Sequence, residues 1–143
     1  MESKLISLST LDNLPNDTIG QDILRYIALP DVLGPEKETL LYFIGKQIAR
    51  KFEINKMEDI IYFFYTLRWG KLELVKEKKK YLLFHLMSDD IVERMKSTYD
   101  VDFRLEAGFI AETITQITER PCECIESTNE RLYRAEFKVH YLD

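Results

Sequence analysis

Hydrophobic side chains recur every three or four residues along several stretches of the chain, which predicts amphipathic helices. Each stretch begins at a residue that favours a helix start, either a polar capping side chain or a proline. Each then continues with an apolar stripe on one face. The predicted helices run from a cap at Asn16 or Asp17 to Pro30, from Pro35 to Phe52, over residues 56–68, from Ser88 to Met95, and from Asp102 to Ile117.

Proline and glycine divide the helical half of the sequence. Pro30 is expected to end the first helix, because proline has no backbone N–H and clashes with the preceding turn. Residues 30–35 are therefore predicted to form a turn, and Asn55 with Glu58 resembles a capping box for the third helix. Gly45 lies within the second predicted helix and Gly108 within the last, where a missing side chain permits close approach of another element.

Apolar and polar residues alternate in the other segments, which predicts β-strands. The pattern gives a hairpin from Leu72 to Met87, with a basic run at residues 76–80 that we interpret as a solvated tip. A third strand is expected at residues 122–126 and a turn at residues 127–130. The last strand, residues 133–141, has the clearest alternation and is typical of a half-buried antiparallel strand.

This order of elements predicts an α+β fold, in which an antiparallel sheet of about four strands packs against a layer of helices. The chain of 143 residues is expected to form a single domain over residues 1–143, with residues 1–15 as a loosely ordered N-terminal segment. Its 45% hydrophobic content is enough for a core without disulfides or metals.

The net charge of -5 argues against a nucleic-acid-binding protein, because phosphate neutralisation needs a surplus of Lys and Arg. The sequence contains no run of about 18–20 apolar residues, so integral membrane association is not expected. The N-terminus also lacks the basic and apolar regions of a secretory signal. With two cysteines only two residues apart, the sequence favours a reducing, cytoplasmic environment.

Candidate catalytic and metal-binding groups are sparse. Cys122 and Cys124 could offer thiolates to a metal, with His85 or His140 as a further ligand. A zinc site usually takes its ligands from two clusters, and the second cluster is missing here. We therefore interpret the two cysteines as buried structural residues. A redox or acylation role for these cysteines stays open.

Paired carboxylates such as Glu106 with Glu112, or Asp89 with Asp90, could supply an acid and a base. We interpret Glu106 as a residue on a helix surface and the two aspartates as capping residues. The five glycines are scattered and form no phosphate-binding loop. The sequence therefore favours a protein that is not an enzyme, with no cofactor and no metal.

Aromatic residues gather around the third predicted helix, whose apolar face is broader than a single packing contact requires. This excess leaves three alternatives open: a helix central to the core, the interface of a homodimer, or the wall of a ligand pocket. The aromatic residues are Tyr62, Phe63, Phe64, Tyr65 and Trp69, with Phe43 and Phe109 if their helices meet them.

Several strings of residues resemble the YslB-like bacterial family of domains of unknown function. The resemblance extends from about Ile19 to Asp143. The strings are residues 25–34 (RYIALPDVLG), 41–46 (LYFIGK), 63–64 (FF), 69–72 (WGKL) and 103–112 (FRLEAGFIAE).

That family is similar to the four-vinyl-reductase domain, to TRAPP vesicle-tethering subunits and to haem-nitric-oxide sensor domains. The resemblance implies a related α+β fold, often dimeric and sometimes with an apolar pocket for an acyl chain. It also implies that the corner at Trp69 adjoins the helix that contains Gly108.

On this basis the expected ligand-binding residues are Phe63, Trp69, Leu105 and Phe109. The expected function is that of a homodimer that binds a small hydrophobic ligand or a protein partner. A pure interaction or scaffold domain without a pocket is the alternative. Cysteines are missing at Glu126, Ser127, Arg134 and Ala135, where the related small-molecule module would carry them, so the resemblance does not extend to a metal site.

Overall fold

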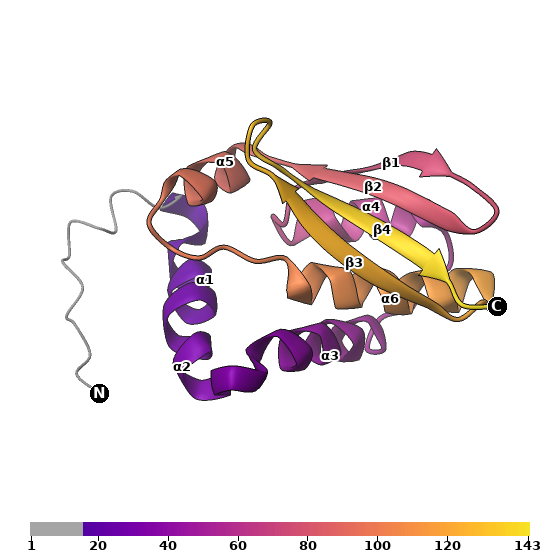
Figure 1. The fold of residues 1–143 in the computed structure, drawn as a ribbon, viewed down its shortest axis with the longest axis horizontal. Helices are drawn as coiled ribbons and strands as arrows, with labels where there is room; N and C mark the ends of the chain where they lie inside the picture. Colours follow the sequence, from indigo (N-terminus) through magenta and orange to yellow (C-terminus); the bar gives the residue numbers. More distant parts are fainter. Residues whose placement is uncertain (1–15) are drawn as a thin grey trace.

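The computed structural model describes residues 16–143 and contains a four-stranded sheet covered on one face by helices (Figure 1). All neighbouring strands are antiparallel, in the order β1-β2-β4-β3. This arrangement confirms the predicted fold class. The expected N-terminal segment, residues 1–15, lies outside the described residues. The strands are β1 (Lys71–Glu77), β2 (Tyr81–Met87), β3 (Cys122–Asn129) and β4 (Arg134–Tyr141).

Strand β4 shows how alternation in the sequence determines the two faces of the sheet. Ala135, Phe137 and Val139 are fully buried against the helices, whereas Lys138 between them is exposed. The predicted strand and its two faces are therefore confirmed. The β1–β2 hairpin is also confirmed, while the β3–β4 turn falls at residues 130–133 because β3 continues to Asn129.

Two long helices, α3 (Lys37–Ala49) and α6 (Arg104–Thr118), lie side by side beneath the sheet (Figure 1). Their contact is unusually close because Gly45 faces the carbonyl oxygen of Leu105, and Gly108 faces that of Tyr42. A methyl group at either glycine would collide with that oxygen. The close approach predicted at both glycines is confirmed. Helix α6, which also contacts α4, β3 and β4, is the centre of the helical layer, and α3 packs along it.

Helices α4 (Met57–Thr66) and α5 (Asp89–Lys96) flank the hairpin. The predicted cap of α5 is confirmed, because the Ser88 hydroxyl accepts a hydrogen bond from the Ile91 amide at 3.0 Å. For α4 the sequence predicts a capping box with Glu58 as its acidic residue, and that choice of residue is wrong. The carboxylate of Asp59, not that of Glu58, accepts hydrogen bonds from the Asn55 and Lys56 amides, because the helix begins two residues after Asn55.

The N-terminal helical segment, residues 16–33, stands at one end of α3 and α6 (Figure 1). It consists of a 3-10 turn (Asn16–Thr18), α1 (Ile19–Ile23), a π-helical turn (Leu24–Ala28) and α2 (Leu29–Leu33). The expected helix end at Pro30 is therefore wrong. Pro30 lies in the first turn of α2, where a backbone N–H is not needed for an intrahelical hydrogen bond. The π-helical turn directly before it has a wider hydrogen-bonding pattern than an α-helix.

Gly34, with a φ of 64°, ends the segment, and a 3-10 turn (Gly34–Glu36) leads into α3. Among residues 16–143, none of the helices is both long enough and apolar enough to cross a bilayer.

Candidate functional site

An apolar hollow lies between the N-terminal helical segment and the α3–α6 pair. Its volume is about 400 Å³. All of its lining residues except Gln21 and Arg25 are hydrophobic, so it is an open, mainly apolar concavity with two polar side chains. We call it the helical hollow; it is lined by Gln21, Leu24, Arg25, Leu29, Leu41, Ile44, Ile48, Leu67, Trp69 and Leu105.

The hollow is built from side chains that helical spacing brings to one side of each element. Leu41, Ile44 and Ile48 belong to the apolar stripe of α3 and follow one another at intervals of three and four residues. On the opposite wall, Leu24 and Arg25 belong to the π-helical turn. Short π-helical turns occur frequently at functional sites, because the inserted residue redirects neighbouring side chains.

The four residues expected to bind a ligand fall into two groups. Trp69 and Leu105 line the hollow. Phe63 and Phe109 are not among its lining residues; their rings stack on one another at 4.4 Å, and both lie edge-on to the Trp69 ring, at 5.9 and 5.5 Å. Phe109 is fully buried. The two phenylalanines therefore pack against the Trp69 ring without lining the hollow themselves.

The rest of the expected aromatic group divides between core and surface. Phe64 packs edge-on to Trp69 at 5.0 Å and belongs to the core. Tyr62 and Tyr65 point away from it and are 69% and 75% exposed, and Phe43 is 52% exposed. The broad apolar face of α4 thus includes a side that no described residue covers.

A buried ion pair joins the segment to α6 immediately beside the hollow. The Arg25 guanidinium donates two hydrogen bonds to the Glu106 carboxylate, at 2.7 and 2.5 Å, and a third to the Asp102 carbonyl oxygen, at 3.2 Å. Glu106 is only 3% exposed, so its interpretation as a helix-surface residue is wrong. Periodicity alone could not reveal this, because the partner arginine is 81 residues away in the sequence.

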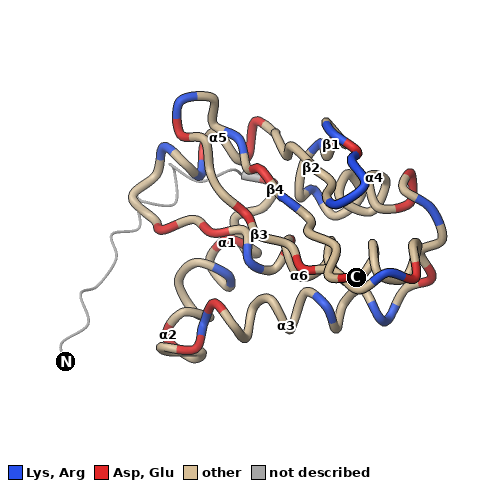
Figure 2. Tube along the Cα trace, turned by 45° about the vertical axis from the view of Figure 1, so that its right-hand side comes forward, with Lys and Arg blue, Asp and Glu red and all other residues tan. Residues whose placement is uncertain are grey.

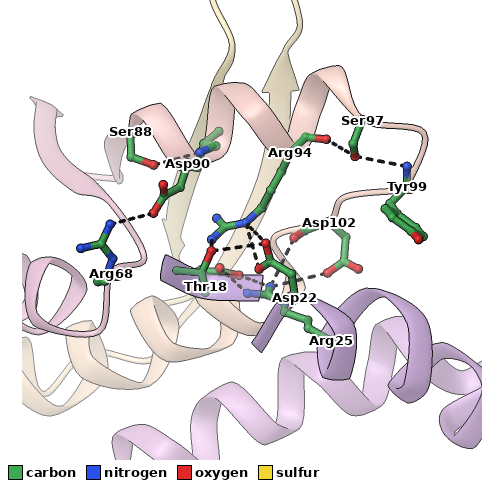
Figure 3. Close-up of polar contacts among 12 residues, drawn as sticks. Thr18, Asp22, Arg25, Arg68, Ser88, Asp90, Arg94, Ser97, Tyr99 and Asp102 are labelled. Atoms are coloured by element: carbon green, nitrogen blue, oxygen red, sulfur yellow. Dashed lines mark hydrogen bonds and ion pairs between the residues drawn. The ribbon is translucent and has the colours of Figure 1, made fainter. Parts of the chain in front are cut away.

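A second buried ion pair joins the segment to α5 (Figure 3). The Arg94 side chain donates hydrogen bonds to both Asp22 carboxylate oxygens at 3.0 Å and to the Thr18 hydroxyl at 2.9 Å. Buried pairs lose hydration on folding, and removal of one partner leaves an uncompensated charge. The two pairs therefore tie the N-terminal helical segment to α6 and to α5.

Arg25 remains charged in this position. Burial alone would lower its pKa, but the negative charge of Glu106 and the hydrogen bonds to it raise the pKa above its usual range. Burial also raises the pKa of the neighbouring Tyr26, so that hydroxyl stays neutral. Among residues 16–143, the Arg25 Nε is buried without a hydrogen-bond partner.

The two cysteines occupy the helix-covered face of β3 and are both buried and free. The Cys122 thiol donates a hydrogen bond to the Ala111 carbonyl oxygen at 3.2 Å, and burial raises the pKa of both thiols. His85 and His140 lie on the opposite face of the sheet, where His85 Nε2 is 4.0 Å from Glu136 Oε2. Residues 16–143 contain no group of three or more acidic, His or Cys side chains that could hold a metal.

Charges of both signs are interspersed along the described part of the chain (Figure 2). The basic residues at the β1–β2 turn are exposed, in agreement with a solvated tip.

Comparisons with known proteins identify relatives across nearly the whole chain. Residues 18–140 match the family described as "Protein of unknown function (DUF2507)". The chain is 36% identical over 132 residues to the uncharacterized protein YslB of Bacillus subtilis, covering 92% of this chain and 89% of that protein. It is 27% identical over 109 residues to the uncharacterized protein MJ1642 of Methanocaldococcus jannaschii, covering 73% of this chain and 64% of that protein.

The fold is similar to the crystal structure of a vinyl-4-reductase family protein from Methanocaldococcus jannaschii. The TM-score is 0.61 at 20% sequence identity, and the match covers 99% of this chain and 85% of the other. At this identity the likeness concerns the fold alone. The family match and the identity to YslB confirm the resemblance found in the sequence, and the chain belongs to the DUF2507 family.

Proposed function

We propose that this protein binds a small apolar ligand in the helical hollow. The observation that carries the proposal is the hollow itself, a volume of about 400 Å³ with an almost wholly hydrophobic lining. Small-molecule sites are typically concave and apolar, with a few polar groups that orient the ligand. Arg25 and Gln21 are such groups here.

The exposure of the lining supports this proposal. Leu24 is 57% exposed and Leu67 is 38% exposed, although both adjoin the fully apolar wall formed by α3. An apolar occupant would remove this surface from water, which contributes about 25 cal/mol for each Å² buried. Burial of the ligand's own surface adds to this gain and opposes the entropy lost on binding.

The chain provides its own reporter, because Trp69 is its single tryptophan and lines the hollow. Titration with the neutral apolar dye N-phenyl-1-naphthylamine should quench Trp69 emission through energy transfer while dye emission rises to saturation. An Ile44→Phe variant, which extends a side chain into the hollow, should weaken dye binding at least tenfold.

Ile125→Phe is the matched control, because Ile125 is 58% exposed on β3, away from the hollow. This variant should bind the dye as the unmodified protein does. A dye that does not bind, or that binds the Ile44→Phe variant equally well, would overturn the proposal.

We also propose that the chain forms a homodimer through the uncovered side of α4. Tyr62 and Tyr65 support this proposal, because they lie one turn apart and are both largely exposed. Large exposed aromatic side chains are enriched at protein interfaces, and a two-fold dimer would bring the same pair together from both copies. Sedimentation equilibrium should show a dimer that a Tyr62→Glu and Tyr65→Glu double variant converts to a monomer.

The alternative proposal is a scaffold domain that pairs through α4 and binds no ligand. Native mass spectrometry of protein purified from its own organism separates the two, because one spectrum reports subunit number and any retained small molecule. A dimer with a reproducible adduct supports ligand binding. A dimer without an adduct, combined with no dye binding, supports the scaffold.

We propose further that the protein acts in the cytoplasm and is not an enzyme. The free, buried thiols favour a reducing compartment. The Glu106 carboxylate beside the hollow is already bound by both terminal nitrogens of Arg25 and so is poorly placed to transfer protons. Adduct masses that change when the purified protein is incubated with its ligand would contradict this proposal.

A further inference from the structure

The turn between β1 and β2 carries a group of free positive charges. Four lysines occur within five residues there, Lys76 and Lys78–Lys80, and all four are exposed (Figure 2). Glu77 is the only acidic residue in this run. None of the ion pairs formed within residues 16–143 involves any of the four lysines. We call residues 76–80 the basic tip; it is positive although the whole chain has a net charge of -5.

Hydrogen bonds to backbone carbonyl groups hold the basic tip in place. The Lys78 amide donates to the Tyr81 carbonyl oxygen at 2.9 Å and closes the turn. The Tyr141 amide donates to the Lys80 carbonyl oxygen at 3.1 Å, and the Arg120 guanidinium donates to that of Lys79 at 3.2 Å. The turn is therefore tied to the end of β4 and to the loop before β3, and its lysines extend from a fixed end of the molecule.

Exposed apolar side chains accompany these lysines. Leu142 directly follows Tyr141, whose amide is bound to the Lys80 carbonyl, and is 58% exposed. Val75 directly precedes Lys76 and is 43% exposed. Peripheral binding to a bilayer combines burial of apolar side chains at the interface with attraction to anionic headgroups. This end of the molecule offers both.

The aromatic rings and the type of cation at this end favour a lipid surface over a nucleic acid. Proteins that bind single strands stack the bases on aromatic side chains. Here a cation already lies over each nearby tyrosine ring, Lys138 over Tyr81 at 4.5 Å and Arg120 over Tyr141 at 3.6 Å. The free cations are all lysines, which act as point charges and lack the guanidinium fork that reads phosphates and bases in pairs of hydrogen bonds.

We infer that the basic tip binds the surface of a lipid bilayer that contains anionic lipids. The lysine ammonium groups contact the headgroup phosphates, and Leu142 enters the interface beside them. The net negative charge of the chain opposes the approach of its other faces, so the protein attaches by this end.

This surface is separate from the helical hollow. Strand β1 (Lys71–Glu77) leads from the corner at Trp69 to the basic tip, and seven residues of strand span about 20 Å. Ligand binding in the hollow and attachment to a bilayer can therefore succeed or fail independently.

Sedimentation of the full chain with vesicles tests the inference. Vesicles of phosphatidylcholine with about 40 mol% phosphatidylglycerol should bind the protein, whereas vesicles of phosphatidylcholine alone should not. Binding should weaken steeply as NaCl rises from about 0.05 to about 0.5 M, because salt screens the charges. Failure to bind the anionic vesicles, equal binding to both kinds of vesicle, or binding that salt does not weaken would overturn the inference.

A triple variant, Lys78→Gln, Lys79→Gln and Lys80→Gln, tests the basic tip itself. Each lysine near an anionic surface strengthens binding about fivefold, so this variant should bind the anionic vesicles about 100-fold more weakly. All three side chains are exposed, so the variant should fold as the unmodified protein does.

The matched control makes the same change in net charge elsewhere, as a Lys71→Gln, Lys96→Gln and Arg131→Gln triple variant. These exposed residues lie at the start of β1, at the end of α5 and in the β3–β4 turn, away from the β1–β2 turn (Figure 1). At separations beyond the Debye length of about 10 Å their charges are screened, so binding should stay within about twofold. Equal losses in the two triple variants would overturn the assignment to the basic tip.

Competition with RNA decides between the two kinds of phosphate surface. Single-stranded RNA of about 20 nucleotides, added at the same phosphate concentration as the accessible lipid, should leave the protein on the anionic vesicles. Displacement of the protein by this RNA would show that the basic tip prefers a nucleic acid and would overturn the inference.

Discussion

The N-terminal helical segment and the α3–α6 pair are held in place by different forces. Helices α3 and α6 meet through Gly45 and Gly108, with backbone against backbone and no space for a methyl group. The segment is joined to the rest of the protein by buried ion pairs at Asp22 and Arg25, and it lines one side of an open apolar hollow. One contact depends on shape, and the other depends on charge.

This difference suggests which part of the molecule can respond to a ligand. Close-packed helices cannot separate without losing many dispersion contacts at once. A segment anchored by a few ion pairs across a hollow can shift by small amounts and still retain its anchors. We therefore expect ligand binding to change the segment and to leave the α3–α6 pair and the sheet unchanged.

The largest expected effect comes from breaking the anchor at Glu106. A Glu106→Gln substitution leaves the buried Arg25 with only the more distant Asp102 carboxylate, at 3.9 Å, as a counter-charge. Removal of one partner of a buried ion pair typically costs about 3–5 kcal/mol. The free energy of unfolding from urea denaturation should fall by this order. Amide exchange should accelerate in residues 19–33 before it does in the sheet, because this pair joins the segment to α6.

Glu112→Gln is the matched control on the same helix. Glu112 pairs with Arg50 at 3.2 Å, but the Arg50 side chain is 47% exposed, and pairs of this kind contribute about 0–1 kcal/mol. Equal losses in the two variants would contradict the view that the buried pair anchors the segment.

The next effect concerns the shape-dependent contact. A Gly108→Ala methyl group would collide with the Tyr42 carbonyl oxygen, so α3 and α6 must separate, at about 1–3 kcal/mol or more. The loss should appear as a lower midpoint in global urea unfolding. Gly20→Ala, in open space on α1, should instead leave stability unchanged or raise it. A neutral Gly108→Ala variant would show that the helices are not in close contact.

A smaller effect is expected at the polar link between α3 and the sheet. The Tyr42 hydroxyl accepts a hydrogen bond from the Cys124 amide at 3.0 Å, and burial raises the pKa of Tyr42 to about 12, so the hydroxyl stays neutral. Tyr42→Phe should lower the free energy of unfolding by about 1 kcal/mol. The loss should be accompanied by faster exchange of the Cys124 amide, and unchanged exchange there would argue against the hydrogen bond.

The smallest effect under ordinary conditions is a dependence on alkaline pH. Burial raises the pKa of Cys124 and Cys122 above the ordinary 9.0, so above about pH 9 the unfolded chain loses thiol protons that the folded chain retains. Their contribution to stability is therefore complete below pH 9 and declines as the pH rises. The decline in urea-unfolding stability should be shallower in Cys124→Ala; an equal slope would contradict this assignment.

Local pattern was sufficient to predict much of the fold. The alternation that ends at Tyr141 identified β4 and its buried face, and Ser88 correctly marked the start of α5. The prediction failed at Pro30, because a proline ends a regular α-helix but is compatible with a π-helical turn followed by a new first turn. Nothing in the apolar spacing distinguishes these two outcomes.

The site was much less accessible to sequence reasoning. Trp69 and Leu105 were expected on the basis of a family resemblance, and they do line the hollow. The wall that contains Gln21 and Arg25 was missed, because it depends on a pairing with Glu106 across 81 residues. A buried ion pair has no local signature, since each partner looks like an ordinary helix-surface charge until the fold brings both together.

The most direct test of ligand binding in the helical hollow is amide hydrogen exchange with and without saturating N-phenyl-1-naphthylamine. Dye bound in the hollow should slow exchange in residues 19–33, around the π-helical turn, with little change in strands β2 and β4. Unchanged exchange in the segment, or protection confined to the α4 surface around Tyr62 and Tyr65, would contradict it.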